Sequence, residues 1–165
     1  MERSIILNKL DIERKIRRMA FQIYESNANE QKIVLAGIVK NGYTLAEKLS
    51  KVLKEISELE VELCRVEVDK KDVFKPVITS LKPEDYTNTS VVLVDDVLHT
   101  GTTLMYGVKH FLEVPLKQFK TLVLIDRNHK KFPIKADFKG LSLSTSYQNH
   151  VEVVLNSKTQ EAFLE

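Results

Sequence analysis

The sequence predicts an α/β fold: a doubly wound, mainly parallel sheet covered by helices on both faces. Three apolar runs carry this prediction: Ile33–Gly37, Val91–Val94 and Leu122–Ile125. None of them alternates with polar residues, which is typical of strands buried on both faces of a parallel sheet. Amphipathic segments separate the runs, as expected of helices that connect parallel strands. The length predicts a single domain over residues 1–165.

The helices are predicted from apolar residues that recur every three or four positions. Asp11 is placed as the N-cap of the first helix, and Ile12 and Ile16 lie on its buried face. The same spacing predicts helices in the segments 45–56 and 104–112. Strands and helices therefore alternate along the chain, as an α/β fold requires.

One further strand and a long polar segment lie between the first and second apolar runs. The segment 61–68 alternates imperfectly between apolar and charged residues, which indicates a strand with one partly exposed face. The polar segment 70–90 follows it, and we expect this segment to form a mobile hairpin or lid. Its basic residues Lys70, Lys71 and Lys75 are expected on a solvated face of the loop.

Charge and composition exclude several classes of function. Lys and Arg number 25 against 23 Asp and Glu, so the formal charge of +2 gives no overall basic field that would indicate nucleic acid. The single Cys64 cannot form an internal disulfide, and the start of the chain lacks the apolar core of a signal peptide. The longest apolar stretch, 33–39, is far shorter than the ~20 residues that span a bilayer. We therefore expect a cytoplasmic protein with no membrane partner.

The stretch VVLVDDVLHTGTT, residues 91–103, carries the first functional prediction. Two carboxylates directly after a buried strand are costly unless something there needs them. The following Thr-Gly-Thr-Thr turn leads into a helix, and the free amides of a helix N-terminus bind phosphate. The adjacent carboxylates would repel a bare phosphate, but they suit a ligand with hydroxyl groups or a divalent cation beside its phosphate. A phosphorylated ribose meets both requirements.

Two other strand ends carry polar loops, KNGY at 40–43 and DRNH at 126–129. Ligands of open α/β sheets bind at the carboxyl ends of the strands, so we expect these loops to line one cleft with the 95–103 loop. The 95–103 loop has neither the Gly-Lys-Ser/Thr ending of a Walker motif nor the three glycines of a dinucleotide site. The four histidines are too far apart in the sequence to indicate a zinc site.

These motifs resemble those of a known family. VVLVDDVLHTGTT resembles the 5-phosphoribosyl diphosphate binding motif of the type I phosphoribosyltransferases. AGIVKNGYTLAEKL looks like the diphosphate-binding turn and following helix of that family. LVLIDRNHKKFPIKADFKG is similar to the same region of the bifunctional pyrimidine-operon regulator and uracil phosphoribosyltransferase. The resemblance covers residues 5–155 and implies the type I fold, with a small hood and a mobile lid hairpin.

The resemblance implies an enzyme that transfers ribose 5-phosphate from 5-phosphoribosyl diphosphate to a nucleobase, with uracil the expected base. Asp95 and Asp96 are then assigned to the ribose hydroxyls, directly or through Mg²⁺ and water. Their charge would favour the cationic ribose of the transition state over the neutral ground state. The resemblance assigns the 5-phosphate to Thr100, Gly101, Thr102 and Thr103.

The resemblance also assigns the two remaining loops. Lys40, Asn41 and Gly42 match the diphosphate turn, where the family often uses a strained and sometimes cis peptide to aim an amide at the leaving group. Asp126 and Arg127 are placed beside the base, while the residues by themselves fit a structural ion pair equally well.

Two positions depart from the family and leave the accepted base open. Asn41 stands where the pyrimidine regulators usually have arginine, and KNGY looks more like the KGGY of hypoxanthine and guanine enzymes. His99 stands where those purine enzymes carry an acid and the regulators carry tyrosine. With an ordinary pKa of about 6.5, His99 is a candidate for proton transfer, and a steric filler is the alternative. Hypoxanthine or guanine therefore stays an alternative to uracil.

A third alternative is an RNA-binding regulator of pyrimidine operons that uses the site as a nucleotide sensor. Lys130, Lys131 and Lys135 retain part of the expected basic surface, whereas the segment 140–146 is less basic than expected.

In the predicted lid, lysines replace the arginine expected from the family, and a lysine cannot make a two-pronged contact with diphosphate. Members of the family assemble as dimers or larger, so a homodimer or higher homo-oligomer is expected.

Overall fold

The computed structural model describes residues 3–144 and 149–165. Its main sheet has six strands in the order β4-β3-β2-β5-β6-β7. From β3 to β7 all neighbours pair in parallel, and β4 pairs antiparallel with β3 at one edge. The strands are β2 (Lys32–Ile38), β3 (Glu60–Glu67), β4 (Ile78–Thr79), β5 (Ser90–Leu98), β6 (Gln118–Arg127) and β7 (Phe138–Leu143). The predicted α/β fold with a mainly parallel sheet is confirmed.

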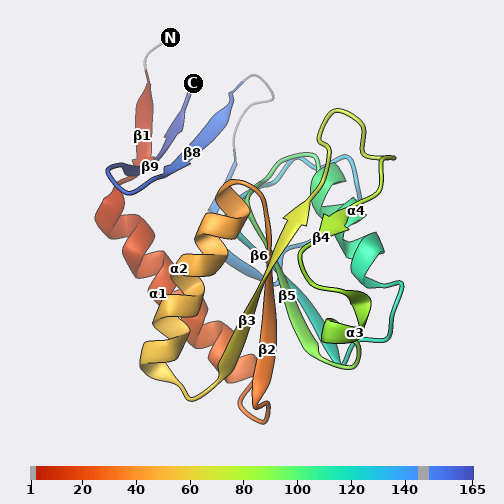
Figure 1. Cartoon of the computed structure of the whole chain (residues 1–165). Coiled ribbons are helices and arrows are strands. Elements are labelled where there is room, and N and C mark those ends of the chain that lie inside the picture. The colour runs from red at the N-terminus through yellow and green to blue at the C-terminus, as the bar shows by residue number, and fades with distance from the viewer. Residues whose placement is uncertain (1–2, 145–148) are drawn as a thin grey trace.

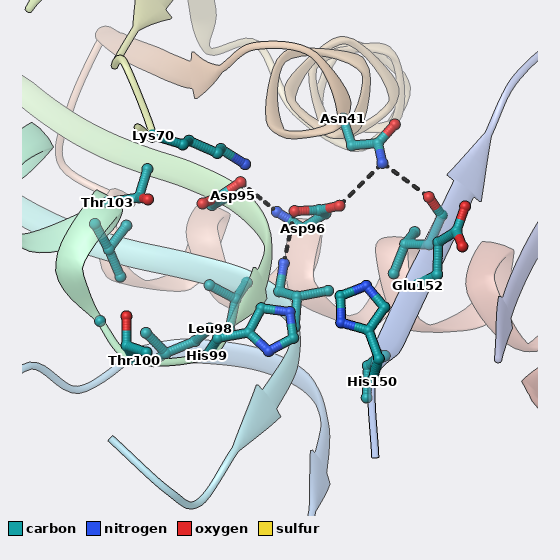
Figure 2. A pocket seen from close by; sticks show the side chains of 16 residues that line it. Asn41, Lys70, Asp95, Asp96, Leu98, His99, Thr100, Thr103, His150 and Glu152 are labelled. Atoms are coloured by element: carbon teal, nitrogen blue, oxygen red, sulfur yellow. Dashed lines mark hydrogen bonds between the residues drawn. The ribbon is translucent and has the colours of Figure 1, made fainter. Parts of the chain in front are cut away.

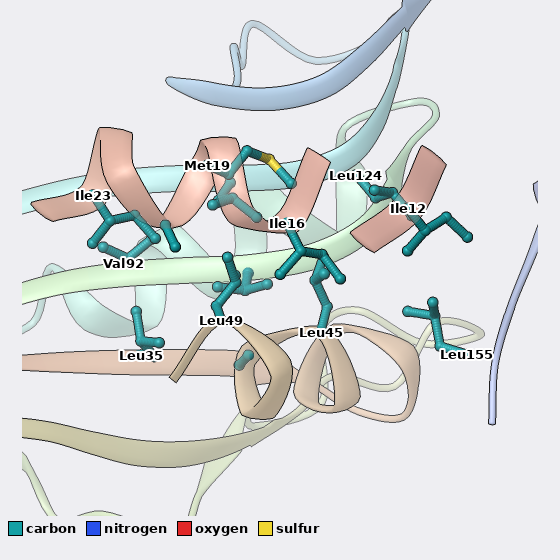
Figure 3. Packing of buried hydrophobic residues seen from close by; sticks show 14 of the residues in the cluster. Ile12, Ile16, Met19, Ile23, Leu35, Leu45, Leu49, Val92, Leu124 and Leu155 are labelled. Atoms are coloured by element: carbon teal, nitrogen blue, oxygen red, sulfur yellow. The ribbon is translucent and has the colours of Figure 1, made fainter. Parts of the chain in front are cut away.

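Helices cover both faces of this sheet, as Figure 1 shows. One face carries α1 (Lys9–Ser26) and α2 (Asn41–Ile56), and the other carries α3 (Pro83–Tyr86) and α4 (Thr102–Phe111). In the first layer, Ile16 of α1, Leu49 of α2 and Val92 of β5 belong to one cluster of buried side chains (Figure 3). The central strands β2 and β5 are buried along almost their whole length, which explains why their sequences do not alternate.

A second, smaller sheet brings the two ends of the chain together. It has three antiparallel strands in the order β1-β9-β8 and lies at the top of Figure 1. These strands are β1 (Ser4–Leu7), β8 (Val151–Leu155) and β9 (Gln160–Leu164). Val151, Val153 and Leu155 point from β8 into the core that also contains α1 and α2. This sheet is the hood that the resemblance implied, and it lies close to the carboxyl end of the main sheet.

Two local expectations need correction. The N-cap of α1 is Asn8, not Asp11; the Asn8 side chain accepts from the Asp11 amide, and the Asp11 carboxylate accepts from the Asn8 amide. Asp11 therefore completes a capping box from the third position of the helix. Only the first part of the segment 70–90 forms the predicted hairpin, between β3 and β4. Its second part forms α3, where Tyr86 is buried against Phe111, so it belongs to the core and not to a lid.

In the residues that the structure describes, none of the helices has both the length and the apolar character needed to span a membrane.

Candidate active site

The loops at the carboxyl ends of β2 and β5 meet strand β8 of the hood around a cavity of about 310 Å³. Asn41, at the start of α2, lies at one side of this cavity, and the 95–104 segment forms its floor (Figure 2). The hood contributes residues 150–153 to the wall next to Asn41. Three parts of the chain that are distant in sequence therefore build one concave site.

Asp95 and Asp96 are adjacent in sequence but lie in different environments. Asp95 is only 5% exposed, and its Oδ1 accepts a hydrogen bond of 2.9 Å from the Asp96 amide. Asp96 is half-buried, and its Oδ1 accepts from the Val97 amide at 2.8 Å. Burial raises the pKa of Asp95 well above its ordinary value, and the neighbouring charge of Asp96 raises it further. The pair by itself therefore favours one negative charge over two.

This electrostatic arrangement predicts that Asp95→Asn stabilises the protein at alkaline pH. Because the pKa of Asp95 is raised in the folded state, that state binds more protons than the unfolded state above about pH 4. The free energy of unfolding of the wild type therefore falls as pH rises through the folded pKa, whereas the variant has no carboxylate to ionise there. Thermal denaturation with a chelator present should give a higher Tm for Asp95→Asn at pH 8, and a smaller difference at pH 5. If the difference in Tm between Asp95→Asn and the wild type narrows as pH rises, ionisation of Asp95 is not the cause of the difference.

Asn41 connects the acidic pair to the hood. Its Nδ2 donates to Asp96 Oδ2 at 2.9 Å and to the carbonyl oxygen of Val153 at 2.8 Å. The preceding turn contains a cis peptide bond between Val39 and Lys40, as the resemblance implied. A Cβ at Gly42 would lie 2.6 Å from the carbonyl oxygen of Val94, so this position has no room for a side chain. The start of α2 is therefore packed directly against the end of β5.

The Thr-Gly turn forms the N-terminus of α4. Gly101 adopts a φ of +88°, a left-handed conformation that favours glycine. The hydroxyls of Thr100 and Thr102 lie 2.9 Å apart. The carbonyl oxygen of Thr100 accepts from the amides of Lys131 and Phe132 at 2.9 and 3.0 Å. The loop after β6 therefore holds this turn in place and leaves the start of α4 open toward the cavity.

His99 lies between the end of β6 and the hood. Its Nδ1 is 3.0 Å from Nη1 of Arg127. The ring of His150 stacks on it with a centroid distance of 5.7 Å and an interplanar angle of 4°. Burial, the Arg127 guanidinium and His150 lower the pKa of His99 to about 4. The ring is therefore neutral at pH 7, which differs from the expectation based on its ordinary pKa.

Asp126 lies behind the site and is ion-paired. It is only 2% exposed, and its Oδ1 lies 3.2 Å from Nζ of Lys130. Nζ of Lys139 lies 3.7 Å from its Oδ2. The ion-pair partners of Asp126 are therefore Lys130 and Lys139, whereas the sequence had suggested Arg127, which instead contacts His99.

Seven of the predicted site residues line the cavity together, and five do not. Those that line it are Asn41, Asp95, Asp96, His99, Thr100, Gly101 and Thr103. Those that lie behind or beside its walls are Lys40, Gly42, Thr102, Asp126 and Arg127. The loops from β2, β5 and β6 therefore converge as expected, although the β6 loop reaches the site indirectly, through the contact of Arg127 with His99 and the bonds of Lys131 and Phe132 to Thr100.

Sequence reasoning missed several wall residues. Lys70 was expected on a solvated loop face with Lys71 and Lys75, but it lines the cavity and points toward Asp95 (Figure 2). The position of Lys70 follows from the β3–β4 hairpin, whose local pattern gives no orientation toward the site. His150 and Glu152 also line the cavity. They belong to the hood, and a hood strand could be placed only through its pairing with β9.

Comparison with known proteins identifies the family. A family model described as "Phosphoribosyl transferase domain" matches residues 2–158. The chain belongs to the phosphoribosyltransferase family. Among the similar proteins, a Bifunctional protein PyrR from Streptococcus thermophilus is 36% identical over 160 residues, which cover 94% of this chain and 91% of that protein. The PyrR protein of Streptococcus mutans is also 36% identical, over 94% of this chain and 89% of its own length.

Solved phosphoribosyltransferase structures share the fold. A hypoxanthine-guanine phosphoribosyltransferase from Bacillus anthracis superposes with a TM-score of 0.72 at 18% identity, covering 87% of this chain and 84% of that chain. The hypoxanthine phosphoribosyltransferase of Trypanosoma cruzi gives a TM-score of 0.74 at 19% identity, covering 87% of this chain and 83% of that chain. The main sheet and its helices are thus those of a phosphoribosyltransferase.

Proposed function

We propose that this phosphoribosyltransferase transfers ribose 5-phosphate from 5-phosphoribosyl diphosphate to uracil, giving UMP and diphosphate. One observation carries the proposal: the Asp95–Asp96 pair and the open N-terminus of α4 face the same cavity. An acidic pair beside a phosphate-binding helix end suits a phosphorylated sugar. The similarity to PyrR proteins and to the pyrimidine-regulator motifs favours uracil over a purine.

The proposal gives each part of the cavity a role. The amides and hydroxyls of the 100–103 turn bind the 5-phosphate. Asp96 accepts hydrogen bonds from the ribose hydroxyls, and its negative charge stabilises the cation that develops at the anomeric carbon. The 40–42 turn binds the leaving diphosphate through its backbone. Lys70 supplies a positive charge to the same cavity, and this charge favours the ionised form of Asp95.

Magnesium is proposed as a partner of the diphosphate substrate. The described residues contain no group of three or more acidic, histidine or cysteine side chains that could hold a metal alone. Asp95 and Asp96 do offer carboxylate oxygens on the cavity floor, and Mg²⁺ commonly takes its other ligands from phosphates and water. These two residues therefore fit an ion that arrives with its substrate. When bound, the ion would neutralise diphosphate charge and favour the ionised form of Asp95.

The proposal is tested by consumption of 5-phosphoribosyl diphosphate in the presence of magnesium. Uracil, hypoxanthine, guanine, xanthine, adenine and orotate are offered separately, and the release of diphosphate is measured. We expect turnover with uracil to exceed turnover with every other base. Preferred turnover of hypoxanthine or guanine would overturn the choice of uracil and support the resemblance of KNGY to purine enzymes. Failure of all six bases would overturn the transferase proposal.

A second candidate function is RNA-binding regulation, which the similarity to proteins named bifunctional favours. Of the three lysines expected on a basic surface, Lys131 and Lys135 are exposed, while Lys130 is paired with Asp126. The segment 140–146, which is less basic than the resemblance leads us to expect, ends at residues 145 and 146, which lie outside the described residues. Saturable binding of pyrimidine-gene leader RNA that persists at physiological salt would support this candidate. Binding that is lost between 50 and 200 mM salt with any RNA, roughly 10³-fold or more, would count against it.

A further inference from the structure

The ring of His99 is oriented by two protein contacts. Nη1 of Arg127 meets its Nδ1 at 3.0 Å, and the ring of His150 covers one face. Figure 2 shows the two imidazole rings facing each other below Asp96. In residues 3–144 and 149–165, no hydrogen bond to Nε2 of His99 is present. Since His99 lines the cavity, Nε2 is the polar atom that it can offer to a ligand.

The contact with Arg127 determines which ring nitrogen carries the proton. A guanidinium has only donor groups and stays charged, so Nδ1 of His99 must be the acceptor. The proton of the neutral ring therefore lies on Nε2. The low pKa of His99, about 4, keeps the ring in this neutral form at pH 7. His99 consequently presents a single N–H donor and no acceptor to the cavity.

The position of His99 relative to Asp96 suits the incoming base. Asn41, in the turn proposed to bind diphosphate, lies on one side of Asp96, and His99 lies on the other (Figure 2). A nucleophile approaches an anomeric carbon from the side opposite to the leaving group. A ribose held by Asp96 with its diphosphate toward Asn41 would therefore receive its base from the side of His99.

We propose that Nε2–H of His99 donates a hydrogen bond to a carbonyl oxygen of the accepted base, and that Arg127 is the positioning residue that fixes this tautomer. The inference rests on the proposed transferase function, because the base must enter this cavity. It restricts the substrate class to bases with an oxo group at the recognised position. An amino group there would place one donor against another and leave both unsatisfied in a partly buried site.

The first test compares His99→Phe, which keeps an aromatic ring without a donor, with His99→Gln, which keeps a donor without the ring. Uracil, 2-thiouracil and 4-thiouracil are used as substrates, because sulfur is a weaker acceptor than oxygen. In the wild type, kcat/KM for uracil should exceed that for one of the thio bases by about 3- to 10-fold, the range expected for one neutral hydrogen bond. This ratio should fall to near one in His99→Phe and persist in His99→Gln.

Two results would overturn the inference. If His99→Phe keeps the wild-type ratio for both thio bases, no donor from His99 contacts the base. If neither variant prefers uracil over the thio base in kcat/KM, the preference depends on the ring of His99 and not on its N–H group. The thio base that shows the discrimination identifies which oxygen of uracil is recognised.

The second test uses nitrogen NMR of the free protein labelled at histidine, and needs no turnover. The signals of His99 are assigned by their loss in His99→Phe. At neutral pH we expect a protonated Nε2 and an unprotonated Nδ1, and a mixture of tautomers in Arg127→Met. A protonated Nδ1 in the wild type would overturn the inference. Absence of turnover with every base would instead overturn the proposed function, and turnover with unchanged ratios would overturn the role of His99 alone.

Discussion

Asp96→Asn is expected to lower kcat/KM for phosphoribosyl transfer by about 10²- to 10³-fold in a protein that remains folded. The substitution keeps the size of the side chain and removes the negative charge that faces the cavity. Loss of one preorganised electrostatic partner of a transition state typically costs this much, which corresponds to about 2.7–4 kcal/mol. Asp96 is half-exposed to the cavity and is not a core residue, so the fold should survive. Steady-state kinetics with uracil and magnesium, together with a thermal melt, measure both expectations.

Asn41→Ala is the matched control for this variant. Asp96→Asn also disturbs the hydrogen bond of 2.9 Å that Asn41 donates to Asp96, because an amide group would then face an amide group. Asn41→Ala removes the same bond, together with the bond to the carbonyl oxygen of Val153, and leaves the charge of Asp96 in place. We expect the control to lose about tenfold or less in kcat/KM, because only the bond to Asp96 is made at the acidic pair. An equal loss in both variants would assign the effect to the hydrogen bond, and near-wild-type turnover in Asp96→Asn would refute the proposed role of the charge.

Gly42→Ala is expected to lower both stability and activity. The added Cβ would lie 2.6 Å from the carbonyl oxygen of Val94 and 3.0 Å from the Cα of Asp95. Both atoms belong to the backbone of a buried central strand, so the turn that begins α2 must move away from β5. Forced overpacking of this kind costs about 1–3 kcal/mol, which lowers Tm by roughly 3–10 °C in a chain of this size. The same displacement moves the whole 40–42 turn that is proposed to bind diphosphate, so KM for 5-phosphoribosyl diphosphate should rise at least tenfold.

Gly107→Ala provides the comparison for Gly42→Ala. A Cβ at Gly107 would lie 3.0 Å from Leu93 Cδ2, a side-chain atom that can move, and not against backbone. Gly107 also lies within α4, where alanine is favoured over glycine by up to about 1 kcal/mol. We expect its Tm and its KM to stay close to those of the wild type. Equal effects of the two substitutions would show that packing against the backbone of β5 is not what makes Gly42 necessary.

The sequence predicted the parts of this protein that depend on neighbouring residues. The buried strands could be identified because an apolar run without alternation is itself the consequence of burial on both faces. The acidic pair and the Thr-Gly turn are contiguous, so their order along the chain already specifies a carboxylate pair next to a helix N-terminus. Even here the local pattern was limited, since it placed the N-cap of α1 at Asp11, when Asn8 is the N-cap and Asp11 completes the capping box.

Only the tertiary structure decided how distant segments complete the site. The hood forms because β9 pairs with β1 on one side and with β8 on the other. The spacing of apolar residues along the chain does not reveal this sheet, since the pairing of β1 with β9 joins opposite ends of the sequence. The hood brings His150 onto His99 and Val153 to Asn41. The neutral state of His99 likewise follows from burial and from the charge of Arg127, 28 positions away in the sequence. Sequence by itself fixes which chemical groups are available, whereas their environment, and with it their protonation and partners, depends on contacts that only the folded chain creates.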